Sequence, residues 1–596
     1  VLADGRILYD RWEYVDRNVA DAQALWTCNA DGTRHALFWG NNTACPGALL
    51  NARPLADPSR AIAVFSSCHD RPWGALGIVD RTKGVDGREP VLRTWPAEFR
   101  NKVRGSSNNS LRGQFFDATV RLPCKYADPF PLDDEHFLCA RQTGHGEEMG
   151  LVYLDLHGNE VLFHRDGLGC HDPMPIRPSK RPPVQSVQRN YVDVKAPGRF
   201  YVQDVYVGTH MKGVPRGSIK ALRVVESPEK RQWTVPRSWW NDAAPVMNWR
   251  AYDSKRVLGT VPVAEDGSAY FEVPGNTFVF FQALDADGKM VQSMRSGVIV
   301  QPGETYGCVG CHESRGGDLP KMEKKSVAFA RAPVKLDGAY NLRGLYRGRI
   351  PETLSFQREV QPVLTRHCVQ CHDYGKPAGE KLNLSGDRGA YFCTSYVDLC
   401  AKGLVACPGD GPAETLPAYS WGARTSRLLK ALEGKHHGVV LTADERDQVI
   451  AWIDLNTPYW PCSECAWPES YGGRMPITCA EHDRLQLLTG RRIANNNADR
   501  RHQQLEQLNF DRPACSRILD PIRGKPAYAE ALAIIEKGKE RLKTNPRADM
   551  EGFVPRAVDR MREARYQRRA AEEKAVYEAI RQGKKKYDNL RGTGHM

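Results

Sequence analysis

Short runs of alternating hydrophobic and polar residues, separated by polar turns, cover the first part of the chain. Such alternation places one side-chain face in a core and the other in solvent, which predicts β-strands. We expect strands at residues 6–9, 61–66, 75–79, 135–140, 151–156 and 160–164. Residues 29–33 and 155–159 have compositions typical of hairpin turns. Regular short strands with such turns predict a sandwich or propeller blades over residues 1–170.

The pattern continues after a segment rich in Pro, Lys and Arg at residues 171–186, which we interpret as a domain boundary. Further strands are expected at residues 200–207, 220–225, 269–273, 277–284 and 290–293. Residues 285–288, Asp-Ala-Asp-Gly, fit a hairpin turn better than a calcium loop, because nothing downstream completes such a loop. These features predict a β-rich middle domain at residues 171–305.

The periodicity changes to helical in the second half of the chain. Residues 355–367 are amphipathic, and Thr442 with Glu445 forms a capping-box pattern at the start of another helix. The buried face of that helix is expected to contain Val449, Ile450, Trp452, Ile453 and Leu455. Residues 525–585 predict two or three charged helices, broken near Pro546 and Pro555.

Two copies of Cys-x-x-Cys-His occur in this half of the chain. The first is Cys308, Cys311 and His312, and the second is Cys368, Cys371 and His372. On one helical turn the two thiols share a face and can each form a thioether to one haem, while the adjacent histidine binds the iron. The spacing therefore predicts two covalently bound c-type haems.

The alternative for these four cysteines is one zinc ion bound by four thiolates. The two pairs lie farther apart than is usual for one zinc knuckle, and neither histidine would then have a role. A third pair, Cys462 and Cys465, is followed by Ala466, lacks the haem histidine and fits disulfide chemistry better.

Composition adds limits to this picture. The 596 residues carry a net charge of +13, and residues 484–596 hold 26 Lys and Arg against 15 Asp and Glu. The main body is thus almost neutral, which argues against a nucleic-acid-binding protein. No run of about 18 apolar residues predicts a transmembrane helix. The 17 cysteines, with haem attachment, indicate an exported, periplasmic protein in which disulfides persist.

Several long segments resemble the hydrazine synthase alpha subunit family: residues 5–17, 201–220, 282–312, 356–373, 436–459 and 528–553. The resemblance implies a multidomain, mainly β protein with a β-propeller that is cut at its N-terminal side, so that the upstream part of a full subunit is missing. It also implies α-helical cytochrome c-like domains after the middle domain and a helical C-terminal tail. We expect a first haem segment at 306–350, a second cytochrome domain at 351–470 and a charged helical region at 471–596.

Enzymes of this family join ammonium to hydroxylamine to make hydrazine. The resemblance of this chain to them implies a role for each of the two motifs. The first haem, at Cys308, Cys311 and His312, corresponds to the catalytic haem, and the second corresponds to an electron-transfer haem. In the family a tyrosine four residues after the motif histidine binds the catalytic iron, and the histidine turns to a zinc ion. This chain has Gly316 at that position, so His312 is expected either to bind the haem iron directly or to join Cys45 and His69 in a zinc site.

Distal ligands are less clearly marked. His436 and His437 are the candidates for the second haem, with His437 slightly preferred and Met475 as the next choice. For the first haem no distal ligand stands out among the candidate histidines His145, His164, His171 and His210. An open distal position is what a catalytic haem needs.

The sequence therefore predicts an exported two-haem redox protein, with His312 at a catalytic haem that acts on small nitrogen compounds. A true hydrazine synthase subunit and a non-catalytic electron-transfer or scaffold subunit are the alternatives. In either case further redox subunits are the expected partners. A true hydrazine synthase would reside in the anammoxosome lumen.

Overall fold

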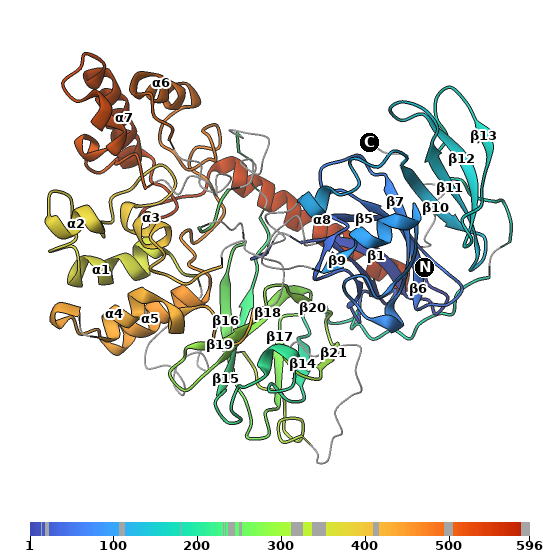
Figure 1. Ribbon diagram of the computed structural model, residues 1–596. Coiled ribbons are helices and arrows are strands. Elements are labelled where there is room, and N and C mark those ends of the chain that lie inside the picture. Colours follow the sequence, from blue (N-terminus) through green and yellow to red (C-terminus); the bar gives the residue numbers. More distant parts are fainter. Residues whose placement is uncertain are drawn as a thin grey trace.

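The computed structural model forms three bodies that follow the order of the sequence (Figure 1). An N-terminal β-rich body is followed by a middle β-rich body and then by a helical body. The structure describes residues 1–13, 15–17, 23–105, 114–178, 180–230, 232, 234–235, 245–249, 253–311, 326–336, 353–408, 416–434, 436–493 and 505–585.

The N-terminal body is built from antiparallel meanders. Its first sheet contains β1 (Ile7–Trp12), β2 (Gln23–Cys28) and β3 (Ala36–Trp39). A four-stranded unit follows, made of β5 (Ala48–Pro54), β6 (Arg60–Ser66), β7 (Gly74–Asp80) and β8 (Val91–Trp95). A second one contains β10 (Tyr126–Pro131), β11 (His136–Gln142), β12 (Met149–Asp155) and β13 (Glu160–Arg165). The short strands β4 (Thr43–Cys45) and β9 (Arg104–Gly105) pair with each other.

The two four-stranded units are joined at one residue pair, Tyr126 and Gly74. Units of four strands have the size of a propeller blade. The β-rich character predicted from the alternating pattern is confirmed, and all six expected strands are present with slightly shifted ends. The described strands do not close into a barrel, so the propeller itself stays a prediction.

The middle body packs two sheets face to face. One contains β14 (Gly198–Val202), β17 (Ala269–Val273) and β21 (Thr305–Cys308). The other contains β15 (Ala221–Glu226), β16 (Arg256–Pro262), β18 (Thr277–Leu284), β19 (Met290–Ser293) and β20 (Val298–Val300). Phe200, Phe271 and Phe281 are packed edge to face or tilted between them. The turn at residues 285–288 is a hairpin between β18 and β19, as predicted.

The helical body contains α1 (Gln361–His367), α2 (Pro377–Lys381), α3 (Thr394–Ala401), α4 (Arg427–Glu433), α5 (Ala443–Asp454), α6 (Cys479–Thr489) and α7 (Ala527–Thr544). A π-helical turn, Phe356–Val360, precedes α1, so the predicted amphipathic segment is helical throughout. The capping box of Thr442 and Glu445 is formed, and the expected face of α5 is buried. The assignment of this body as a cytochrome c-like domain stays a prediction.

The last helix, α8 (Ala557–Arg581), leaves the helical body and crosses toward the N-terminal body (Figure 1). The ring of Tyr577 stacks on Tyr191, with 4.8 Å between ring centres. Helices α7 and α8 are separated by the segment that contains Pro546 and Pro555, which confirms the predicted break. Most side chains of α8 are exposed, which agrees with its strongly charged sequence.

Buried polar residues connect the three bodies. Lys255 of the middle body lies 2.7 Å from Asp16 and 3.2 Å from Asp253, and all three side chains are buried. Asp454, at the end of α5, accepts hydrogen bonds from the backbone N–H groups of Met290 and Ala423 at 2.9 and 2.7 Å. Burial raises the pKa of Asp454 to about 6.

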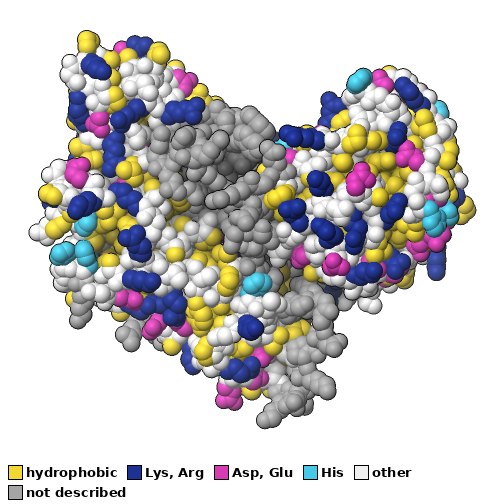
Figure 2. Space-filling view, viewed as in Figure 1, with side chains coloured by type: hydrophobic (Ala, Val, Ile, Leu, Met, Phe, Trp, Pro, Cys, Tyr) yellow, Lys and Arg dark blue, Asp and Glu magenta, His cyan; other side chains and the backbone are white. Residues whose placement is uncertain are grey.

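Two predicted properties concern the molecule as a whole. None of the helices that the structure describes has the length and apolar character needed to cross a bilayer. Among the described cysteines no disulfide is formed, so the disulfide framework, including that of Cys462 and Cys465, stays a prediction. Figure 2 shows Lys and Arg side chains interspersed with Asp and Glu on the face in view, without a continuous basic stripe.

Candidate functional site

The first cysteine motif lies where the middle body faces the N-terminal body. Cys308 is the last residue of β21, which runs parallel to β14, and the backbone N–H groups of Gln203 and Asp204 donate to the carbonyls of Cys308 and Val309. A Cβ at Gly310 would lie 2.2 Å from the carbonyl oxygen of Val207. Glycine is therefore required between the two cysteines, because the turn packs directly on the backbone.

A cavity of about 220 Å³ opens beside this turn, and Cys308, Gly310 and Cys311 form part of its wall. Its remaining lining comes from both β-rich bodies. Apolar side chains include Trp26, Leu37, Val85, Val202, Leu222, Phe281, Ala283 and Val298, and the cationic ones are Arg17 and Arg295. Two thiols beside apolar walls suit a flat apolar macrocycle held by thioethers, so these described residues fit a c-type haem, although Asp86 also lines the cavity and Arg17 already pairs with Glu13.

His35 is the histidine among the residues that line this cavity. Its Nδ1 lies 2.6 Å from the hydroxyl of Tyr9, and the Tyr306 hydroxyl donates to the His35 carbonyl at 2.9 Å. Burial and the nearby guanidinium of Arg11 lower the pKa of His35, which favours the neutral imidazole. No sequence pattern pointed to this residue, because a single histidine between two strands has no distinguishing neighbours. The four histidines proposed as distal candidates lie elsewhere: none of His145, His164, His171 and His210 is among the described lining residues.

His312 and Gly316 lie outside the described residues, so the role of His312 at the iron or at zinc stays a prediction. Of its expected zinc partners, Cys45 is fully buried in β4, and burial raises the pKa of its thiol to about 12. His69 Nδ1 lies 2.9 Å from Asp117 Oδ2, an arrangement that orients many metal-binding histidines. Among the described residues, Cys45 and His69 do not belong to any group of three suitable ligands.

The second motif begins directly at the end of α1. The backbone N–H of Cys368 donates to Leu364, and those of Cys371 and His372 donate back to Cys368, at 2.8 to 3.0 Å. The motif therefore forms a helical turn that places both thiols on one side. Burial, with the neighbouring Cys371 thiol, raises the pKa of Cys368 to about 11. Cys371 is exposed, so the pair is accessible from solvent.

His372 and His436 face each other across a short gap. His372 Nδ1 lies 3.0 Å from the carbonyl of Leu382, which leaves Nε2 as the nitrogen for a metal. The ring centres of His372 and His436 are 6.3 Å apart. Two imidazoles that each bind one metal ion through a nitrogen at about 2 Å have ring centres roughly 6 Å apart. The pair therefore fits an iron bound between the two rings.

The other two distal candidates are placed differently. The ring of His437 packs against His436, with 4.3 Å between centres, and its backbone is left-handed with a φ of 47°. Met475 is fully buried in the core of the helical body. The geometry favours His436 over His437, although the sequence pattern could not separate two adjacent histidines.

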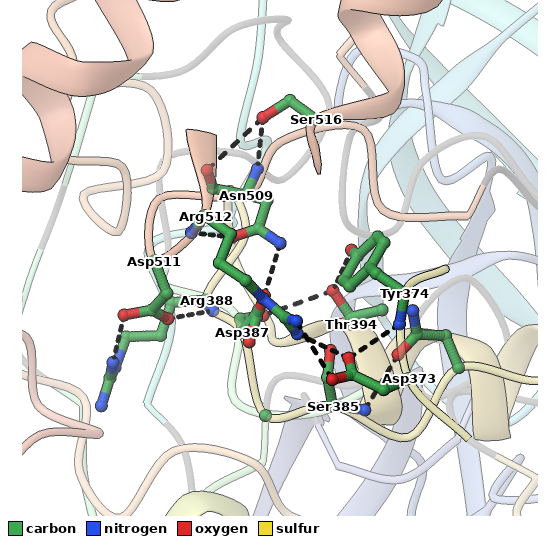
Figure 3. A network of polar contacts seen from close by, with 12 residues as sticks. Asp373, Tyr374, Ser385, Asp387, Arg388, Thr394, Asn509, Asp511, Arg512 and Ser516 are labelled. Atoms are coloured by element: carbon green, nitrogen blue, oxygen red, sulfur yellow. Dashed lines mark hydrogen bonds and ion pairs between the residues drawn. The ribbon is translucent and has the colours of Figure 1, made fainter. Parts of the chain in front are cut away.

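A polar network connects the second motif to the C-terminal region (Figure 3). The guanidinium of Arg512 donates to both carboxylate oxygens of Asp373 and to Asp387 Oδ2. Asn509 also donates to Asp387, at 2.6 Å. Asp373 is only partly buried. These contacts lower the pKa of Asp373, mainly through the hydrogen bond from Arg512. The residue that follows His372 is thereby fixed by a segment more than a hundred residues away.

Comparison with known proteins agrees with this arrangement. Residues 217–313 match the family described as the hydrazine synthase alpha subunit middle domain. Hydrazine synthase subunit alpha of Kuenenia stuttgartiensis is 23% identical over 316 residues, which cover 42% of this chain and 39% of that protein. The chain is a hydrazine synthase alpha-like protein. The resemblance predicted from the sequence segments is thus confirmed.

A solved structure of Kuenenia stuttgartiensis hydrazine synthase has the same fold over much of the chain. The TM-score is 0.56 at 18% identity, and the match covers 76% of this chain and 68% of that chain. The chain spans about two fifths of the length of the curated relative it matches. The matched family segment ends at residue 313 and so includes the first cysteine motif.

Proposed function

We propose that this chain is a c-type cytochrome of the hydrazine synthase alpha type, with one haem at Cys308 and Cys311 and another at Cys368 and Cys371. The observation that carries the proposal is that His436 lies opposite His372. His372 is the last residue of an intact Cys-x-x-Cys-His turn. A c-type haem supplies reversible one-electron redox chemistry when bound.

The two sites differ in what their residues can do. At the second site His372 and His436 would hold the haem iron between them, and an iron saturated in this way suits electron transfer. At the first site the cavity beside the two thiols would hold the haem, and His35 is the histidine among its described lining residues. His35 provides an imidazole whose neutral form is favoured, and the Tyr9 hydroxyl hydrogen-bonds its ring. We therefore place substrate binding at the first site and propose a haem-dependent oxidoreductase of small nitrogen compounds.

The remaining parts of the proposal follow from the same family. An exported compartment, the periplasm or an equivalent, is where c-type haems are attached and is the proposed location. The relative is named as a subunit, so we propose that further redox subunits exchange electrons with the second site. True hydrazine synthesis is tested by supplying hydroxylamine and ammonium to the chain assembled with such subunits. Hydrazine formation would assign that reaction, and its absence would restrict the proposal to another redox reaction.

Mass spectrometry of the matured, exported protein tests haem attachment directly. Peptides that contain Cys308 with Cys311, and Cys368 with Cys371, should each carry one haem. The double variants Cys308→Ala/Cys311→Ala and Cys368→Ala/Cys371→Ala should each retain one haem per chain. The double variant Cys462→Ala/Cys465→Ala is the matched control, because this pair lacks the motif histidine, and it should retain two. Unmodified thiols at the first four positions would refute the proposal.

A further inference from the structure

Three potential metal ligands of different chemistry lie together at the edge of the N-terminal body. They are His164 in β13, Asp166 just after it and Cys170 in the following loop. One ligand atom from each lies within 4.8 Å of the others. We propose that these residues bind a divalent metal ion of the zinc class. This site is separate from the haem sites of the proposed function and does not depend on them.

The backbone brings the three residues together in a defined way. His164 pairs with Leu151 of β12, and the register shifts between this pair and the next one, Val152 with Leu162. The shift leaves Phe163 as an extra residue in β13, and such bulges change the direction of neighbouring side chains. The backbone N–H of Cys170 then donates to the Met149 carbonyl at 2.9 Å. The loop therefore folds back beside the start of β12 and returns the thiol to the histidine.

The loop between the ligands is also fixed locally. Asp166 Oδ1 accepts the backbone N–H of Leu168 at 2.9 Å, which leaves Oδ2 for another contact. Gly169 has a φ of +84°, and a Cβ there would lie 2.7 Å from the carbonyl oxygen of Glu147. The return of the chain to Cys170 thus requires glycine. These contacts hold the loop in a shape that presents three donors on one side.

The donor set matches the preferences of zinc. Imidazole nitrogen, carboxylate oxygen and thiolate sulfur are its usual ligands, at about 2.0 to 2.3 Å, in tetrahedral geometry. Three protein ligands leave one position for water. His164 and Asp166 are exposed and Cys170 is half-buried, so an ion can enter without rearrangement of the core. The two neighbouring side chains that can carry a positive charge contact other residues: Arg165 pairs with Glu148, and His171 pairs with Asp128.

The position of the site indicates what a metal would do there. The ligands lie where the last strand of the N-terminal body ends and the extended, Pro-rich segment at 171–186 begins. Strand β13 is the edge of its sheet, and all six of its side chains are exposed. An exposed edge strand of this kind has unpaired backbone N–H and C=O groups that can pair with another chain. A metal ion would fasten β13 to the loop that follows it and fix the direction in which the chain leaves the sheet.

Zinc binding to the full, haem-loaded chain tests the proposal. The protein is treated with a chelator, and Zn²⁺ is then added in a calorimetric titration. We expect a Zn²⁺ site that weakens by about tenfold or more in Cys170→Ser and in His164→Ala, since even supporting residues of metal sites contribute 10- to 100-fold. His157→Ala, in the exposed turn between β12 and β13, is the control and should bind as the unchanged chain does. Haem content should be the same in all four proteins.

X-ray absorption at the zinc edge gives a second, independent readout that haem does not obscure. The unchanged protein should show one sulfur at about 2.3 Å with nitrogen or oxygen ligands at about 2.0 Å. The sulfur contribution should disappear in Cys170→Ser. Equal zinc affinity in the double variant His164→Ala/Cys170→Ser and the unchanged chain would overturn the proposal. A zinc spectrum without sulfur would do the same.

Discussion

Arg512 binds both carboxylate oxygens of Asp373, at 2.6 and 3.1 Å, and Asp373 directly follows His372. The same guanidinium reaches Asp387, so one side chain joins the C-terminal region to the turn that carries the second motif. Bidentate pairs of this kind fix geometry as well as adding stability. The position of His372 relative to His436 therefore depends on a residue from another part of the chain.

Replacing Arg512 by Ala should lower the free energy of unfolding by about 1–3 kcal/mol, because three charge-assisted hydrogen bonds are lost. The midpoint potential of the second haem should also change, because the turn that carries His372 loses its support. Denaturant unfolding and a redox titration measure the two effects. Arg484→Ala is the matched control: Arg484 pairs with Glu530 in the same bidentate way on the open surface, and little change in either quantity is expected. An unaltered potential in Arg512→Ala would contradict this role.

Substitution of the adjacent histidines should separate their roles at the second site. His436→Ala should convert one low-spin haem to a form that binds carbon monoxide, because the ring opposite His372 is lost. His437→Ala should leave the spectrum unchanged, because its ring packs against His436 instead. Absorption and electron paramagnetic resonance spectra measure both outcomes. Added imidazole should restore the low-spin spectrum of His436→Ala, and the opposite pattern would assign the ligand to His437.

His35 should influence ligands at the first site alone. His35→Gln should alter the affinity of this haem for small exogenous ligands such as nitric oxide, since the imidazole lines the cavity beside Cys308 and Cys311. Tyr9→Phe should act in the same direction but more weakly, because the hydroxyl only orients the ring. Ligand titrations followed by absorption measure the effect, with His136→Ala, away from the cavity, as the control. A change in the spectrum of the second haem would show that the effect is indirect.

Lys255 should be important for stability. Replacing it by Met would remove the ammonium group that pairs directly with the buried carboxylates of Asp16 and Asp253, at a cost of about 3–5 kcal/mol. Adding Asp16→Asn to that variant should recover part of the loss, because one buried charge is removed. Thermal and denaturant unfolding of the full chain measure both. Full additivity of the two substitutions would show that the residues do not interact.

Acid should weaken the contact between α6 and α7 over a defined range. Burial alone would raise the pKa of Glu481, but hydrogen bonds from Arg541 and Lys537 bring it from 4.5 down to about 2. The ionised form is thus favoured in the folded state, and the stabilisation is complete above pH 4.5 and is lost as the pH falls toward 2. After solvent screening we expect the ionised Glu481 to contribute about 1–2 kcal/mol to the free energy of unfolding. Glu481→Gln should remove this pH dependence, whereas Glu530→Gln should leave it in place.

The sequence by itself determined the features that depend on neighbours within a few residues. The capping box of Thr442 and Glu445, the amphipathic face of α5 and about half of the strands of the two β-rich bodies were predicted, since backbone periodicity decides which side chains share a face. The Cys-x-x-Cys-His spacing likewise requires only one turn. Resemblance to the hydrazine synthase alpha family was also evident at this level and was confirmed.

Only the tertiary structure decided which distant residues meet. His35 and Cys308 line one cavity although they come from the two ends of the β-rich region, and Tyr9 hydrogen-bonds the His35 ring. Arg512 reaches Asp373 across 139 residues, and His436 rather than His437 faces His372. Contacts of this kind depend on how whole sheets and helices pack, and no periodicity along the chain records that packing. Local sequence patterns therefore specified many of the elements and the spacing of the two cysteine motifs, while packing specified the residues that surround them.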